Sequence, residues 1–104
     1  MLYQADQLDQ LQLHLMKNLH TLENSEEAAS EEHPSWDPYD INNVDRYPGL
    51  LSRAKIVESL RDLRDRGLAQ PVRVRYAAYS EWRLTPEGRA IIIEMLPQLE
   101  AVPA

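Results

Sequence analysis

The sequence predicts a small α+β domain built around one hydrophobic core. Its 104 residues, of which 43% are apolar, suffice for a single core and not for two, so we expect no multidomain enzyme. Residues 5–22 place leucines at three- and four-residue steps, as a helix does, whereas residues 72–76 and 81–85 alternate apolar and polar side chains, as strands do. Helical periodicity combined with an alternating segment is the pattern of a mixed fold.

The N-terminal part is predicted to form an amphipathic helix within residues 1–22, followed by an acidic linker over residues 23–35. Residues 5–22 contain neither Gly nor Pro. The linker carries several acids and no cation, and it cannot bury enough apolar surface to offset its ordering entropy. We expect a loop or partly disordered segment in which residues 26–32 have the composition for a helical turn. The apolar stripe of the helix consists of Leu8, Leu11, Leu15, Leu19 and Leu22, widened by Leu13 and Met16.

The composition changes at Trp36, where a domain over residues 36–104 is expected to begin. An Asp-Pro pair suits the start of a short helix over residues 38–44. A serine suits the N-cap of a second helix over residues 53–66, and a glycine follows where a helix C-cap is expected. These signals predict two consecutive helices separated by a Tyr-Pro-Gly turn.

A β-hairpin and a last helix are predicted to follow. Strands over residues 72–76 and 81–85 are expected to turn a common face to the core, carrying Val72, Val74, Tyr76, Trp82 and Leu84. Thr85 suits an N-cap, and the proline and glutamate after it suit a first helical turn. The last helix is therefore expected to run from Pro86 to about Leu96, and Pro97 to end or bend it.

This order of elements resembles the winged helix-turn-helix domain of MarR-like and PadR-like transcriptional regulators. The likeness is carried by SRAKIVESLRDLRDRGLA at residues 52–69 and WRLTPEGRA at residues 82–90, and it covers residues 36–96. The resemblance implies that the helix over residues 53–66 enters the major groove of DNA. It also implies that the hairpin over residues 72–84 is the wing, which touches the DNA backbone or the minor groove.

The predicted DNA contacts lie at the N-terminal end of the second helix and along the hairpin. Opposite its apolar stripe this helix carries two cations against three acids, so its middle is poorly suited to base reading. Arginines alternate with valines on the first strand, where they point away from the core. The predicted contacts are Ser52, Arg53, Lys55, Arg61, Arg73, Arg75 and Arg83. The alternative is a solvated helix surface with ion pairs between Glu58 and Arg61, Arg61 and Asp65, and Asp62 and Arg66.

The charge is divided between the two halves of the chain. Residues 1–45 hold ten acids and one lysine, whereas residues 46–104 hold ten basic residues and seven acids. We therefore predict a cytoplasmic transcriptional regulator that binds double-stranded DNA, either sequence-specifically or as an architectural protein. The alternative is a winged-helix protein-interaction module that does not bind DNA, with a partner on the acidic N-terminal half or the first helix.

The terminal helices also predict a homodimer. Their apolar side chains exceed what one small core absorbs, and an exposed apolar patch marks an interface. The alternative is that the first helix only covers its own domain. The residues predicted at the interface are Leu8, Leu11, Leu15, Leu22, Ile91, Ile92 and Met95.

No motif indicates catalysis, a metal, a cofactor or a membrane. The chain has no cysteine, and its three histidines lack metal-ligand spacing. The acidic residues 37–45 do not match a calcium loop, and no phosphate-binding loop, nucleophile elbow or dinucleotide fingerprint occurs. No run of 18 apolar residues and no signal peptide is visible. We therefore predict a binding protein rather than an enzyme.

Overall fold

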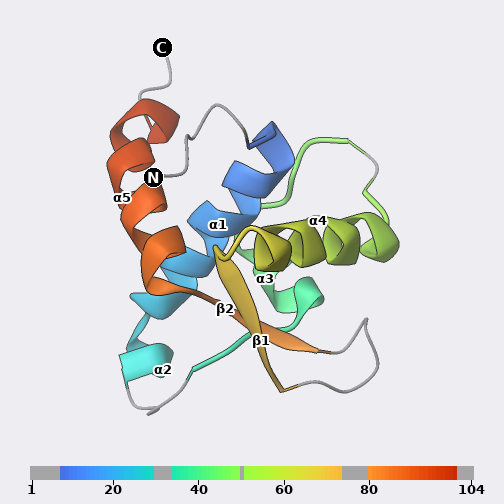
Figure 1. Cartoon of the computed structure of the whole chain (residues 1–104), viewed down its shortest axis with the longest axis horizontal. Coiled ribbons are helices and arrows are strands. Elements are labelled where there is room, and N and C mark those ends of the chain that lie inside the picture. The colour runs from blue at the N-terminus through green and yellow to red at the C-terminus, as the bar shows by residue number, and fades with distance from the viewer. Residues whose placement is uncertain (1–7, 30–33, 50, 74–79, 101–104) are drawn as a thin grey trace.

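The computed structural model describes residues 8–29, 34–49, 51–73 and 80–100. Within them the α+β class predicted from the sequence is confirmed, since helices pack on a two-stranded antiparallel sheet (Figure 1). None of the described helices combines the length and apolarity needed to cross a bilayer. The elements are α1 (Gln10–Glu23), α2 (Glu26–Ala29), α3 (Pro38–Val44), α4 (Arg53–Asp65), β1 (Ala69–Arg73), β2 (Glu81–Leu84) and α5 (Pro86–Glu100).

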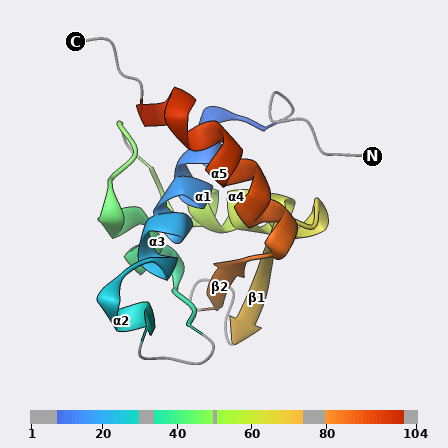
Figure 2. The same ribbon diagram turned by 90° about the vertical axis from the view of Figure 1, so that its left-hand side faces the viewer.

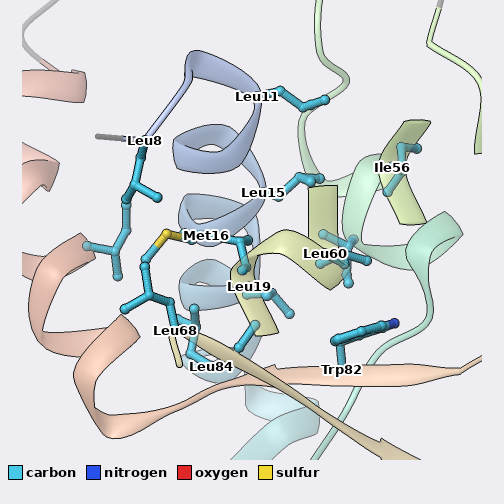
Figure 3. Close-up of a cluster of buried hydrophobic side chains, with 14 residues drawn as sticks. Leu8, Leu11, Leu15, Met16, Leu19, Ile56, Leu60, Leu68, Trp82 and Leu84 are labelled. Carbon is cyan, nitrogen blue, oxygen red and sulfur yellow. The ribbon is translucent and has the colours of Figure 1, made fainter. Parts of the chain in front are cut away.

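Helix α1 lies at the centre of the fold and contacts α3, α4, α5 and β2. Figure 2 shows it running beside α5, and Figure 3 shows Leu15 and Leu19 pointing toward Leu60 of α4, with Trp82 of β2 below. The predicted leucine stripe is therefore buried inside the domain to which α1 belongs. Among the described residues, the core consists of Leu8, Leu11, Leu15, Met16, Leu19, Ile41, Ile56, Leu60, Leu63, Leu68, Ala69, Trp82, Leu84 and Ile92.

The acidic segment after α1 contains the short helix α2, in the part where a helical turn is expected. Beyond it, Trp36 forms an isolated antiparallel bridge with Trp82 of β2, with N–H···O distances of 3.0 and 2.7 Å. The backbone at Trp36 therefore extends the sheet by one residue, in the order Trp36, β2, β1.

Helices α3 and α4 begin at the predicted caps. The Asp37 carboxylate accepts a hydrogen bond from the backbone N–H of Asp40 at 2.8 Å, and the Ser52 hydroxyl accepts one from the backbone N–H of Lys55 at 3.2 Å. The chain leaves α4 through Gly67, whose φ of +76° lies in the left-handed region. This turn is the glycine stop that the sequence predicts.

The first strand differs from the prediction. β1 begins at Ala69, whose backbone pairs with Leu84, and a register shift follows between Pro71 and Arg73. Trp82 and Leu84 are buried as predicted, but Val72 is 37% exposed, so its predicted core position is wrong. The earlier strand start puts Ala69 in the core position, and the bulge places an extra residue before Arg73. Val74 and Tyr76 lie outside the described residues.

Helix α5 begins at the predicted cap, because the Thr85 hydroxyl accepts a hydrogen bond from the backbone N–H of Gly88 at 3.0 Å. A Cβ built on Gly88 would lie 2.0 Å from the Leu68 carbonyl oxygen, so only glycine lets the first turn approach this closely. The helix continues through Pro97, so the prediction that it stops near Leu96 is wrong. Near a helix end a proline removes only one backbone N–H, which this last turn tolerates.

Candidate nucleic-acid interface

The N-terminal end of α4 exposes the first three predicted DNA contacts. Ser52, Arg53 and Lys55 are all exposed, beside the backbone N–H groups that begin the helix. The Lys55 ammonium lies 3.8 Å from the Glu58 carboxylate, and both side chains remain more than half exposed. Such an exposed pair is weak, so Lys55 remains available to a phosphate. The cations and the positive end of the helix dipole together give this end of α4 the chemistry of an anion site.

The middle of α4 faces a groove of about 590 Å³, which we call the α1–α4 groove. Its lining contains four carboxylates and two cations, so its charge disfavours a phosphate backbone. The residues that line it are Asp9, Gln12, Ala54, Lys55, Glu58, Ser59, Arg61, Asp62 and Asp65. Asp9, the N-cap residue of α1, adds a carboxylate to this face that the sequence does not predict. The face is therefore more acidic than α4 alone would make it.

The ion pairs along α4 match the sequence expectation in part. Arg66 pairs with Asp62 at 2.8 Å, as the alternative reading predicts. Arg64 pairs with Asp65 at 3.2 Å. In the described part of the chain Arg61 makes no ion pair, although pairs with Glu58 and Asp65 were expected. Arg61 is exposed, so it stays a candidate phosphate contact.

Of the three hairpin arginines predicted to contact DNA, the structure describes the side chain of Arg83. Arg73 pairs through its backbone with Glu81, whereas Arg75 lies outside the described residues. The Gln70 side-chain amide is oriented with its oxygen toward Arg83. The Arg83 guanidinium donates two hydrogen bonds to this oxygen, of 2.9 and 3.2 Å. Arg83 shares a hollow of about 390 Å³ with residues of α1 and α5, and no α4 residue lines this hollow. Arg83 therefore lies away from the N-terminal end of α4.

This hollow is lined by an ion pair that the sequence does not predict, between Glu23 and Arg89. The Arg89 guanidinium of α5 donates hydrogen bonds to both carboxylate oxygens of Glu23, at 3.0 and 3.1 Å. The hydrogen bond to Glu23 raises the pKa of Arg89, against the lowering effect of partial burial. One acid of the predicted linker thus holds the end of α1 to the start of α5, and no local sequence signal marks a pair 66 residues apart.

The predicted dimer residues divide into two groups. Leu8, Leu11, Leu15 and Ile92 are buried in the chain's own core, and Leu15 and Ile92 have no exposed surface. The remaining three, Leu22, Ile91 and Met95, are partly buried against that core. Among the large apolar side chains of α5 that the structure describes, Ile93 is the exposed one, at 51%.

Among the described residues, no group of three or more histidines and acids is close enough to hold a metal ion. His14 instead contacts the Asp45 carbonyl oxygen and lies edge-on to the Tyr47 ring, with 5.3 Å between ring centroids. Its role in the described structure is to hold the end of α3 against α1.

The described part of the chain has a fold that is also found in a solved protein structure. After α1 and α2 its elements are the helices α3 and α4, the hairpin of β1 and β2 with the bridge at Trp36, and the closing helix α5. One solved structure that shares this fold is a candidate DNA-binding protein from Ralstonia eutropha JMP134. It has a TM-score of 0.64 and 19% sequence identity, over 86% of this chain and 99% of that chain. No family model and no curated protein matches the sequence.

Proposed function

We propose that the protein binds double-stranded DNA through the N-terminal end of α4 and the hairpin, and that it regulates transcription by this binding. The observation that carries the proposal is the exposure of Arg53 and Lys55 at a helix N-terminus, in a fold shared with a candidate DNA-binding protein. The resemblance to MarR-like and PadR-like regulators supports the same role.

The proposed contact is mainly with the phosphate backbone. Cations and helix N-terminal amides position a protein on DNA, whereas base reading needs donors and acceptors along the helix face. On α4 that face is lined mainly by carboxylates, which phosphates repel. The protein then acts by blocking or recruiting other factors rather than by catalysis, and its cytoplasmic location stays a prediction.

A salt titration of binding to a random DNA duplex tests this function. Neutralising a phosphate contributes about 0.9 to the slope of log affinity against log salt, so we expect a slope of roughly −3 to −5 per domain. The measurement is fluorescence anisotropy of a labelled duplex between low and physiological salt. Absence of binding to any duplex at low salt would refute the proposal.

We also propose that two copies associate through the exposed side of α5. The observation behind this is the exposure of Ile93, which lies on the side of α5 away from the core-packed Ile91 and Met95. The proposed homodimer is the one expected from the sequence, but its interface differs. The leucines Leu11 and Leu15 of α1 lie in the core, so they do not form that interface.

A further inference from the structure

The hollow beside the hairpin has a positively charged lining. It contains two arginines against one glutamate, in a chain whose net charge is −6. Its volume of about 390 Å³ lies in the range of small-molecule sites. We call it the α1–α5 hollow, and the residues that line it are His20, Glu23, Asn24, Pro34, Arg83, Arg89 and Ile93.

The acid in this lining, Glu23, is already neutralised. Both of its carboxylate oxygens accept hydrogen bonds from Arg89, and its side chain is only 11% exposed. These bonds use Nε and Nη2 of Arg89, so its Nη1 keeps N–H donors that have no partner among the described residues. An anion that enters the hollow therefore meets guanidinium donors and not an unpaired carboxylate.

The charge of Arg83 is not neutralised by an acid. In the described part of the chain Arg83 makes no ion pair. Its Nε and Nη2 both donate to one neutral acceptor, the Gln70 amide oxygen, and its Nη1 has no partner there. A neutral amide accepts hydrogen bonds but does not cancel a positive charge, whereas an oxyanion does both. Arg83 thus offers one uncompensated charge at a half-buried position.

The remaining residues of the lining add a polar donor and two apolar contacts. The side-chain nitrogen of Asn24 lies 3.3 Å from Nε2 of His20. An amide nitrogen only donates, so we assign the ring hydrogen of a neutral His20 to Nδ1, which has no partner among the described residues. Pro34 and Ile93 supply apolar surface. Ile93 also belongs to the surface proposed for the dimer, so the hollow borders that surface.

We propose that the α1–α5 hollow binds a small organic oxyanion, a carboxylate or a phosphate monoester with a short apolar chain. Arg83 and Arg89 hold the charged group, and Ile93 packs against the chain. A DNA duplex is not the occupant that the hollow favours, because the acidic segment 23–35 borders it and repels a polyanion. The proposal does not rest on DNA binding, since no α4 residue lines the hollow.

A titration of the full, nitrogen-labelled chain followed by two-dimensional NMR tests the proposal. The probes are hexanoate and hexyl phosphate, and hexanamide is the neutral control with a similar apolar chain. We expect at least one anion to bind with a dissociation constant of about 1 mM, the strength that a ligand of this size can reach. The tighter anion identifies the charged group. The backbone signals of Asn24, Arg83 and Arg89 should move, and that of Arg53 should not.

Three variants separate the charge of Arg83 from its structural role. Arg83→Gln should weaken anion binding about tenfold, because a charge-assisted hydrogen bond is lost. Gln70→Ala removes the internal partner of Arg83 but keeps the guanidinium, so anion affinity should stay unchanged or rise. Arg61→Gln removes the same charge from an exposed position of α4 and should change affinity by less than about twofold.

Several results would overturn the proposal. These are no binding of either anion at about ten times the expected dissociation constant, or binding of hexanamide as tight as that of the anions. Equal weakening by Arg83→Gln and Gln70→Ala would show that Arg83 only holds the hairpin together, and equal weakening by Arg61→Gln would show unspecific attraction. Lower duplex affinity of Arg83→Gln would mean that the hollow faces DNA. Arg53→Gln should lower duplex affinity and leave anion affinity unchanged, so the two proposals fail separately.

Discussion

The side chain of Gln12 connects the beginning of α1 to Asp62 of α4. Its amide oxygen accepts a hydrogen bond from the backbone N–H of Asp9 at 3.0 Å, and its amide nitrogen donates to the Asp62 carboxylate. Gln12 is only 4% exposed, so water does not readily replace these partners. One side chain thus completes the capping box of α1 and fixes α4 against it.

Replacing this residue, Gln12→Ala, is expected to lower the free energy of unfolding by about 1–3 kcal/mol. The reason is that the backbone N–H of Asp9 and the Asp62 carboxylate both lose a partner in a partly buried place. Urea unfolding followed by circular dichroism measures the change. Gln10→Ala, at an exposed position of the same helix, is the control and should cost less than about 0.5 kcal/mol. Equal losses for both variants would contradict the role assigned to Gln12.

The two arginines Arg53 and Arg83 should differ in their effect on DNA binding. Arg53→Gln is expected to make the salt slope shallower by about one unit, since one phosphate contact is lost. Arg83→Gln should leave the slope unchanged, because Arg83 is bonded to Gln70 in a hollow beside α1 and α5. Both slopes come from the same duplex titration. A shallower slope for Arg83→Gln would mean that DNA reaches the other face of the hairpin.

The close approach of α5 to Leu68 predicts a strong effect of Gly88→Ala. The added Cβ would lie 2.0 Å from a backbone carbonyl oxygen, so α5 has to shift, at a cost of about 3 kcal/mol or more. Gly49→Ala separates this steric effect from backbone strain. Gly49 has a φ of +95° but no atom within 4 Å of an added Cβ, so strain alone should cost about 1–2 kcal/mol. If urea unfolding gave both variants the same stability, the close contact would be refuted.

The proposed dimer predicts different outcomes for Ile93→Glu and Leu15→Glu. Ile93 is 51% exposed, so its replacement should give a monomer of nearly unchanged melting temperature. Leu15 has no exposed surface, so a carboxylate there should prevent folding instead of only separating subunits. Sedimentation at micromolar concentration and thermal unfolding distinguish the two effects. A parent protein that sediments as a monomer would disprove the dimer.

The sequence predicts the starts of α3, α4 and α5 well because their signals are local. Ser52, Asp37 and Thr85 each cap a backbone N–H only three residues ahead in the chain, so their spacing alone identifies them. The glycine at the end of α4 is local in the same sense. These local features predict the order of α3, α4 and α5 and the place of the hairpin.

The remaining features depend on contacts between distant parts of the chain. The start of β1 at Ala69 follows from packing in the core, and the bulge that exposes Val72 has no signature in the valine-arginine alternation. Gln12 and Asp62 are 50 residues apart, so the acidic groove cannot be recognised from either segment alone. The same limit applies to Arg83. The alternation of apolar and polar residues along its strand predicts that its side chain points outward, but it does not predict which helices lie beside that side chain.

The bridge between Trp36 and Trp82 gives the protein a built-in optical reporter. These are the only two tryptophans in the chain, and their backbones are hydrogen-bonded to each other where the segment before α3 meets β2. All indole fluorescence therefore arises from one place, and Trp82, at 2% exposed, should emit at the short wavelengths of a dry environment. Any ligand that pulls the hairpin away from the segment before α3 would admit water to this ring and shift the emission to the red. A movement of the hairpin can thus be followed in the unlabelled protein.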